Sequence, residues 1–233
     1  MSSPHQPPAL NWRDETIPVS QRFDDPYFSL AGGLEETRHV FLTGNGLPGR
    51  FRDGFRIAEL GFGTGLNLLA VLLAHRGPGH LHYTSFEAFP MSGDDIARAL
   101  TAFPEVAVVA EPFLRQWAAG ATVLEFPNLT ATVVLGDARQ TLARWDGQAD
   151  AWFLDGFSPA KNPELWSPVL MEEVARHTAP GGTFATYTAA GHVRRALAEA
   201  GFAVTRQPGF GRKRHMSTGV LQPSATASRM SPG

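Results

Sequence analysis

The sequence predicts one doubly wound α/β domain, with a Rossmann-like sheet covered by helices on both faces. Stretches typical of strands alternate with stretches of helical spacing between residues 55 and 206. A glycine-rich turn, Gly61 to Gly65, follows the first of these strands. The chain has 233 residues, 43% of them hydrophobic, which suffices for a packed core.

Short apolar runs predict the strands, and apolar residues three or four positions apart predict the helices. The strands are expected at 55–60, 81–87, 150–154, 183–188, 202–206 and 215–221, and the helices at 66–74, 94–103, 106–117, 163–177 and 192–200. Residues 121–126 and 130–135 flank Pro127-Asn128 and predict a hairpin. We expect a mostly parallel sheet whose C-terminal strand is antiparallel.

The ends of the chain differ in composition from its middle. Residues 1–10 are rich in proline and residues 223–233 in serine, alanine and proline, so both ends are predicted to be disordered. The middle, 11–222, is predicted to be one domain. Within it, 11–54 shows no clear periodicity apart from a short helix at 34–42, and we expect this extension to cover the site.

Composition excludes several classes of protein. The chain has no cysteine, which rules out disulfides, zinc–thiolate sites and thiol catalysis, and we predict no metal centre. No apolar run approaches the roughly 20 residues that span a bilayer, and no signal peptide begins the chain, so we expect a cytoplasmic protein without membrane association. The net charge of −2 argues against a wholly basic nucleic-acid binder. From Gly201 onward, however, five basic residues and no acidic ones occur, which suits either an anionic partner or a solvated tail.

The glycine turn lies between an expected strand and an expected helix, as a nucleotide-binding turn requires. Its spacing is GxGxG, whereas the dinucleotide fingerprint places its third glycine one position later. Glu59 precedes the turn and would oppose a pyrophosphate, but it suits a ligand that carries an ammonium, such as S-adenosylmethionine. The cofactor-binding residues expected here are Glu59, Gly61, Phe62, Gly63, Thr64, Gly65 and Asn67.

Two further acids follow expected strands. Glu87 ends the second strand, where a carboxylate can accept hydrogen bonds from both ribose hydroxyls. Asp137, with Ala138 beside it, follows the strand that ends at Leu135. Asp137 is expected either to accept the adenine amino group or to cap the next helix, and the two roles are compatible.

The most distinctive stretch is DGFSPAKNPELW, from Asp155 to Trp166. It leaves the carboxyl end of an expected strand, where α/β active sites collect. Lys161 is one of only two lysines in a chain that otherwise uses arginine for its cations, which suggests a need for a compact ammonium. A proline-punctuated connecting loop, with Asn162 capping the next helix, is the structural alternative.

These motifs together resemble the methyltransferase part of the bifunctional tRNA methylaminomethyl-thiouridine biosynthesis family. The resemblance covers most of residues 11–221 and is most specific in DGFSPAKNPELW. The other similar stretches are FDDPYFS, GLEETRHVFL, AELGFGTGLN, SFEAFP, GGTFATYTAAGHVRRAL and GFGRKRHM. It implies that 11–222 is a methyltransferase domain of the class I S-adenosylmethionine-dependent fold. The implied reaction is methyl transfer to the amine of 5-aminomethyl-(2-thio)uridine at the tRNA wobble position.

The resemblance also implies partners and residue roles. The tRNA anticodon loop is the expected substrate, and an FAD-dependent oxidase acting upstream is the expected associate. No second glycine fingerprint occurs, so no FAD domain is expected within these residues. Asp155, Phe157 and Lys161 are the candidate catalytic residues, and Asp155 either accepts the substrate's proton or holds the methionyl amine. The candidate substrate-binding residues are Tyr27, Phe28, Arg194, Arg212, Lys213 and Arg214.

Other functions remain open at this point. A nicotinamide-dependent reductase is disfavoured by the GxGxG spacing and Glu59. A polyamine-forming aminopropyltransferase shares the fold, but the DGFSPAKNPELW loop and the basic C-terminal run fit it less well. An N-methyltransferase acting on another amine and a non-catalytic module that binds adenosylmethionine are the remaining alternatives.

Overall fold

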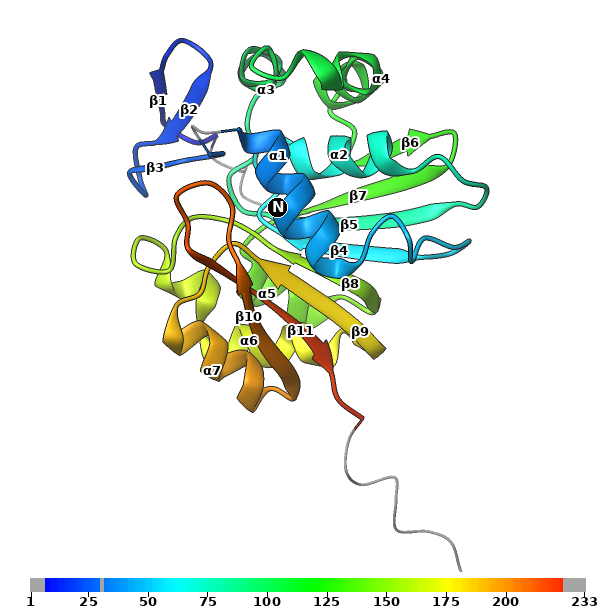
Figure 1. Cartoon of the computed structure of the whole chain (residues 1–233). Coiled ribbons are helices and arrows are strands. Elements are labelled where there is room, and N and C mark those ends of the chain that lie inside the picture. Colours follow the sequence, from blue (N-terminus) through cyan, green and yellow to red (C-terminus); the bar gives the residue numbers. More distant parts are fainter. Residues whose placement is uncertain (1–6, 30–31, 224–233) are drawn as a thin grey trace, which may run out of the picture.

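The computed structural model describes residues 7–29 and 32–223. Eight strands form one central sheet in the order β10-β11-β9-β8-β4-β5-β7-β6 (Figure 1). Its strands are β4 (Arg56–Leu60), β5 (Leu81–Glu87), β6 (Val123–Phe126), β7 (Leu129–Leu135), β8 (Ala149–Leu154), β9 (Thr178–Thr186), β10 (Phe202–Pro208) and β11 (His215–Leu221). The five strands β7, β5, β4, β8 and β9 are mutually parallel, and β11 is inserted antiparallel between β9 and β10. The predicted fold class is confirmed.

Helices cover both faces of this sheet (Figure 1). One face carries α1 (Gly33–Thr37), α2 (Leu66–Ala74), α3 (Gly93–Leu100) and α4 (Ala107–Ala118), and the other carries α5 (Ala138–Thr141), α6 (Pro168–Arg176) and α7 (Gly191–Glu199). Each face has its own apolar cluster, and residues of β4 alternate between them: Ile57 faces α2, whereas Ala58 and Leu60 face the other layer. This alternation follows from the period of two along a strand.

Short helical turns connect the main elements. A π-helical turn, Arg38–Leu42, continues α1, and short 3-10 turns occupy Thr43–Asn45, Pro104–Val106, Leu142–Arg144 and Pro163–Trp166. The helix expected over 163–177 is therefore divided. Ser167 adopts an extended backbone (φ −66°, ψ 148°) because Pro168 follows it, and its side chain accepts a hydrogen bond from the Leu170 amide at the start of α6.

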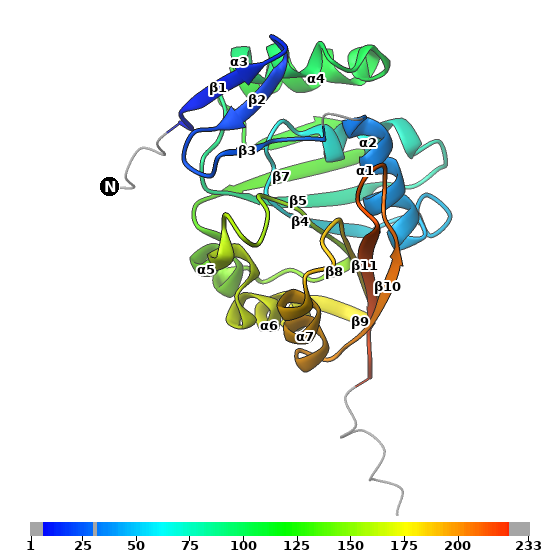
Figure 2. The ribbon, with the colours of Figure 1, turned by 60° about the vertical axis from the view of Figure 1, so that its left-hand side comes forward.

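The N-terminal region contains a small separate sheet that the sequence did not reveal. Its strands are β1 (Leu10–Arg13), β2 (Ile17–Ser20) and β3 (Asp25–Pro26), each too short to show a clear alternation. Figures 1 and 2 place this sheet beside α3, and the Arg98 guanidinium lies 4.0 Å from the ring centroid of Trp12. Leu10 begins β1, so the expected disorder of residues 1–10 extends too far; residues 1–6 lie outside the described residues, as do 224–233 of the expected tail.

Several other boundaries shift by a few residues. The expected helix at 106–117 forms despite Pro112, because the carbonyl that loses its partner belongs to Val108, which is 77% exposed and faces water. The strand expected at 183–188 starts earlier, at Thr178. In the part of the chain that the structure describes, no helix combines the length and apolar character needed to cross a membrane.

Candidate active site

A large cavity of about 1160 Å³ lies at the carboxyl ends of the parallel strands. Pockets for one small ligand usually measure about 300–1,000 Å³, so this volume leaves room for two reactants. Its wall is drawn from segments far apart in the sequence. These are residues 22–29, α1, the turn after β4, the ends of β5 and β7, the loop after β8, Tyr187 and the β10–β11 loop.

The glycine turn after β4 forms one side of the cavity. Gly61 has a φ of +81°, and a Cβ there would lie 3.1 Å from the Gly156 Cα, so the turn packs directly against the loop after β8. The predicted residues Gly61, Phe62, Gly63, Thr64 and Asn67 all line the cavity. Gly65 instead caps α2 and faces the Phe113 ring, where a Cβ would come within 2.9 Å.

Glu87 lies at the tip of β5 in the cavity wall, with 9% of its surface exposed. One carboxylate oxygen accepts a hydrogen bond from the Gly63 amide at 3.0 Å and the other from the Phe89 amide at 2.7 Å. Burial raises the pKa of Glu87, against the effect of these amides. Two backbone donors thus fix the carboxylate, while its remaining lone pairs can accept bonds from a ligand.

Glu59, which was expected to contact a ligand, is not among the residues that line the cavity. It lies within β4 on the face covered by α2, and it is fully buried. Asn67 Nδ2 donates to Glu59 Oε1 at 2.7 Å, and Ser85 Oγ donates to Oε2 at 2.7 Å. Burial holds the pKa of Glu59 well above its ordinary value. Glu59 therefore positions Asn67, which does line the cavity.

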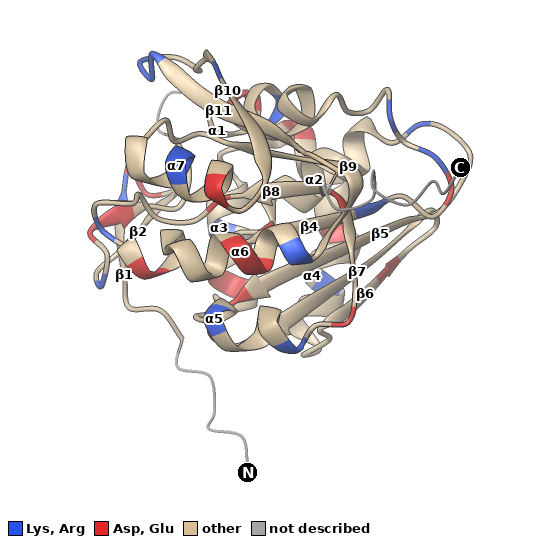
Figure 3. Ribbon diagram, turned by 90° about the horizontal axis from the view of Figure 1, so that it is seen from below, with Lys and Arg blue, Asp and Glu red and all other residues tan. Residues whose placement is uncertain are grey.

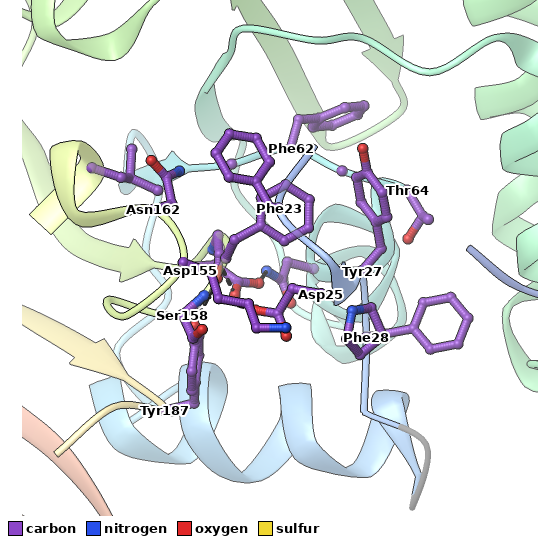
Figure 4. Close-up of a pocket in the computed structure, with 18 of the residues that line it drawn as sticks. Phe23, Asp25, Tyr27, Phe28, Phe62, Thr64, Asp155, Ser158, Asn162 and Tyr187 are labelled. Atoms are coloured by element: carbon purple, nitrogen blue, oxygen red, sulfur yellow. Dashed lines mark hydrogen bonds between the residues drawn. The ribbon is translucent and has the colours of Figure 1, made fainter. Parts of the chain in front are cut away.

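Asp155 follows β8 and projects into the cavity (Figure 4). Its Oδ2 accepts a hydrogen bond from Asn67 Nδ2 at 2.8 Å, and its Oδ1 accepts one from the Gly156 amide at 2.8 Å. Burial raises the pKa of Asp155 to about 6, although both hydrogen bonds oppose the shift. This carboxyl group therefore changes charge close to neutral pH, as a general base requires.

Asp137 has one of its two expected roles, the helix cap, and it also lines the cavity. It lines the cavity together with Ala138 and caps α5, where it accepts a hydrogen bond from the Arg139 amide at 2.9 Å. The Arg139 guanidinium also pairs with both carboxylate oxygens, which lowers the pKa of Asp137. Because Arg139 already donates two hydrogen bonds to each carboxylate oxygen, a ligand would have to share these oxygens with Arg139 or displace it.

Aromatic rings form the opposite wall of the cavity (Figure 4). Phe157, from the loop after β8, stacks on Phe23 with 4.6 Å between ring centroids and meets the edge of Tyr27 at 5.0 Å. Phe28 also lines this wall, as expected. Phe23 was missed by the sequence reasoning, although the aromatic cluster FDDPYFS to which it belongs was noted.

Both lysines form ion pairs with acidic side chains of the protein. Lys161 lies 2.7 Å from Asp24 Oδ2 and ties the loop after β8 to the β2–β3 connection. Lys213 lies 2.7 Å from Glu36 Oε1 and ties the β10–β11 loop to α1. Lys213 was expected to bind the substrate as part of the basic run at 212–214, and it lines the cavity. Glu36 was not predicted, because a single acid in a short helix carries no distinguishing pattern.

The expected basic surface is divided in two. The tip of the β10–β11 hairpin carries basic residues (Figure 3), namely Arg212, Lys213 and Arg214. Of these, Arg212 and Lys213 line the cavity. Arg194 lies on α7, among the helices of the opposite layer, and does not line the cavity. Tyr187 is a further missed residue. It follows the end of β9, a position that could have indicated it, and its hydroxyl donates to the Gly156 carbonyl at 2.7 Å.

Comparison with known proteins assigns the chain and its fold to a family. The sequence model described as S-adenosyl-L-methionine-dependent methyltransferase matches residues 104–222, just over half of the chain. The chain belongs to this family. The class I methyltransferase fold that the resemblance implied is thus confirmed.

Individual relatives carry more specific names than the family model. The chain is 46% identical to the "tRNA 5-methylaminomethyl-2-thiouridine biosynthesis bifunctional protein MnmC" of Caulobacter sp. (strain K31), over 100% of this chain and 41% of that protein. It is 47% identical to the protein of the same name from Pseudomonas aeruginosa PAO1, over 94% of this chain and 36% of that one. The chain thus spans about two fifths of these relatives. The crystal structure of MNMC2 from Aquifex aeolicus is similar with a TM-score of 0.76 and 26% identity, over 94% of this chain and 73% of that one.

The methyltransferase's own residues fit adenosylmethionine. The ligand combines an adenosine, which needs hydrogen-bond acceptors, with a positively charged sulfonium. Glu87 and Asp137 supply acceptors at neighbouring strand tips, and Asp155 supplies negative charge beside the glycine turn. No group of three or more potential metal ligands occurs among residues 7–29 and 32–223.

Proposed function

We propose that this methyltransferase transfers a methyl group from S-adenosylmethionine to the amine of 5-aminomethyl-(2-thio)uridine at the tRNA wobble position, giving 5-methylaminomethyl-(2-thio)uridine. The observation that carries the proposal is Asp155, an acid with a pKa of about 6 in a cavity large enough for two reactants. The names of the relatives, which cover this chain at 46–47% identity, point to the same modification.

The cofactor half of the cavity is the side formed by the strand tips. Glu87 accepts hydrogen bonds from the ribose hydroxyls, and Asp137 with Ala138 contacts the adenine. The turn from Gly61 to Thr64 lets the backbone approach the ligand closely. S-adenosylmethionine, when bound, supplies an electrophilic methyl group on a positively charged sulfur.

The chain's main chemical task is to remove a proton from the acceptor amine. A primary alkylamine resembles lysine, with a reference pKa near 10.4, and is mostly protonated at pH 7. Asp155 accepts a hydrogen bond and then a proton from the acceptor nitrogen, whose freed electron pair forms the new bond to carbon while the carbon–sulfur bond breaks. Positioning supplies most of the remaining acceleration, up to roughly 7–11 kcal/mol.

The aromatic wall holds the target base. Unpaired anticodon bases can be splayed out and stacked on aromatic side chains. Phe157 and Phe23 offer flat faces, and Tyr27 and Phe28 close the same side. Arg212 and Arg214, on the exposed hairpin loop, contact tRNA phosphates, so tRNA affinity is expected to fall steeply with salt.

The acceptor amine has to be produced by an earlier reaction. The relatives are named as bifunctional proteins, and this chain spans about two fifths of them. We infer that an FAD-dependent oxidase generates the amine before this methyltransferase acts, in a part of those proteins that this chain does not span.

The test is transfer of labelled methyl groups to tRNA isolated from a strain that lacks the enzyme, followed by nucleoside analysis. Label in 5-methylaminomethyl-(2-thio)uridine supports the proposal. Label in another nucleoside contradicts the substrate. Cofactor binding without any transfer would indicate the non-catalytic module, and transfer of an aminopropyl group from decarboxylated adenosylmethionine to a polyamine would indicate the aminopropyltransferase.

A further inference from the structure

Three acids in or beside the cavity, Glu59, Glu87 and Asp155, are each held by two hydrogen-bond donors of the protein itself. Side-chain amide, hydroxyl and backbone N–H groups supply these bonds. Glu36, which lines the cavity from α1 and is 7% exposed, differs. Its buried Oε1 has no amide or hydroxyl donor among the described residues, and its near partner there is the Lys213 ammonium. A buried carboxylate held in this way depends on a cation.

The cation present is the ammonium of Lys213. It lies 2.7 Å from Glu36 Oε1 and 4.2 Å from the centroid of the Tyr187 ring. The Tyr187 hydroxyl donates to the Gly156 carbonyl, which fixes the ring beside the loop that carries Asp155. A buried carboxylate facing an aromatic ring is the arrangement that recognises an alkylammonium ion.

The two side chains of this ion pair differ in how deeply they are buried. The Glu36 side chain is 9% exposed, whereas the Lys213 side chain is 43% exposed and extends from the loop between β10 and β11. Arg212 and Arg214 flank Lys213 on that loop. The carboxylate and the ring therefore form a fixed site, and the lysine is the part that can leave.

We propose that Glu36 and Tyr187 form a binding site for a primary alkylammonium group of a reactant, and that Lys213 occupies it as a stand-in when the reactant is absent. Two reactants of the proposed function carry such a group, the methionyl end of the cofactor and the aminomethyl group of the uridine. This inference rests on the proposed function for its ligands. Lys213 leaves the site when either ammonium enters.

This arrangement predicts opposite effects for the two partners of one ion pair. Glu36→Gln removes the site, so binding of the ammonium ligand weakens by about 10- to 100-fold, the range for a hydrogen bond to a charged group. Lys213→Met removes the competitor, so the same ligand binds equally well or more tightly. If the ion pair only fastens the hairpin loop to α1, Glu36→Gln and Lys213→Met should instead weaken ligand binding by the same factor.

The first arm measures binding by calorimetry, without tRNA. The ligands are S-adenosylhomocysteine, which has the α-ammonium, and 5′-methylthioadenosine, which lacks it. If the cofactor is the source, Glu36→Gln weakens only S-adenosylhomocysteine, and Lys213→Met does not weaken it. Glu35→Gln is the matched control, because Glu35 is a neighbouring and exposed acid of the same helix, and it should change neither affinity.

The second arm measures kcat/KM on tRNA that carries the aminomethyl group, at saturating cofactor. If the tRNA amine is the source, Glu36→Gln leaves S-adenosylhomocysteine binding unchanged and lowers kcat/KM at least tenfold, whereas Lys213→Met lowers it much less. Because the first arm needs no tRNA, failure of the proposed substrate and failure of the ammonium site are separable.

Two results would overturn the inference. One is that Glu36→Gln, folded as judged by its melting temperature, changes neither S-adenosylhomocysteine binding nor kcat/KM. The other is that Lys213→Met loses as much as Glu36→Gln in the affected measurement. If Glu36→Gln does not fold, Lys213→Met still decides, because its side chain is partly exposed: a tenfold or greater loss in this variant alone overturns the inference.

Discussion

The floor and the cover of the cavity are built from different kinds of contact. The floor consists of the strand tips with Glu87, Asp137 and Asp155, whose carboxylates are bonded mainly to backbone amides, Asn67 and Arg139. The cover consists of residues 22–29 and the β10–β11 loop, and two of its ties are the ion pairs Lys161–Asp24 and Lys213–Glu36.

The floor and the cover have different tasks: the floor carries the reaction, and the cover admits the substrate. Short-range bonds to the backbone fix the floor before any ligand arrives, and such preorganisation is what electrostatic catalysis needs. The exposed Lys161–Asp24 pair contributes only about 0–1 kcal/mol, so this part of the cover can open at little cost. A macromolecular substrate has to enter past the cover and react at the floor, so substitutions in the floor should have the larger effects.

The largest effect is expected at Asp155. Asp155→Asn keeps the size of the side chain but removes the proton acceptor, so kcat should fall by about 10²- to 10⁴-fold, the contribution typical of general bases. Single-turnover methyl transfer measures this loss, and Asp146→Asn, an exposed acid outside the cavity, serves as the control. A near-normal rate would remove Asp155 from the chemistry.

The next effect is expected at Glu87. Glu87→Ala removes the acceptor proposed for the ribose hydroxyls and frees two backbone amides, so the Kd for S-adenosylhomocysteine should rise by about 10- to 100-fold. Calorimetry measures this change. The rate at saturating cofactor should fall much less than it does for Asp155→Asn, and an unchanged Kd would show that the ribose binds elsewhere.

A smaller effect is expected where floor and cover meet, at Phe157 and Phe23. Stacking of a base on an aromatic ring contributes about 1–3 kcal/mol, so Phe157→Ala should raise the KM for tRNA by about 5- to 100-fold. Cofactor affinity should stay unchanged, and Phe157→Trp should restore the KM in part. Loss of cofactor binding together with tRNA binding would mean that the ring supports the whole cavity.

The smallest effect is expected in the cover. Lys161→Met removes an exposed ion pair, so the melting temperature should change by only a few degrees and kcat/KM by a few-fold. Thermal unfolding and steady-state kinetics measure these changes. A loss comparable to that of Asp155→Asn would give Lys161 a direct role in the reaction and would erase the distinction between floor and cover.

Sequence reasoning predicted the floor better than the cover. The glycine turn, Glu87, Asp137 and Asp155 follow strands, and the carboxyl ends of parallel strands meet at one edge, so local patterns were enough to bring them together. Glu59 is the exception, since it lies within β4 and its side chain points to a face of the sheet.

The sequence predicted that residues 11–54 cover the site, with Tyr27 and Phe28 among the substrate-binding residues, but it could not predict the contacts of the cover because they are long-range. Nothing in the local sequence pairs Lys213 with Glu36, or Phe23 with Phe157, across more than 100 positions. The strands β1 to β3 are too short to show a period, and the basic run at 212–214 does not by itself indicate that Lys213 lines the cavity.

The pH dependence of kcat/KM tests most directly whether Asp155 takes the proton of the acceptor amine. Burial raises the pKa of Asp155 to about 6, so its charged form, the proton acceptor, is lost as the pH falls through that value. The wild-type kcat/KM should therefore rise up to pH 6 and then level off. Asp155→Asn should keep rising about tenfold per pH unit towards the amine's own pKa near 10.4. A plateau above pH 6 that persists in Asp155→Asn would contradict the account.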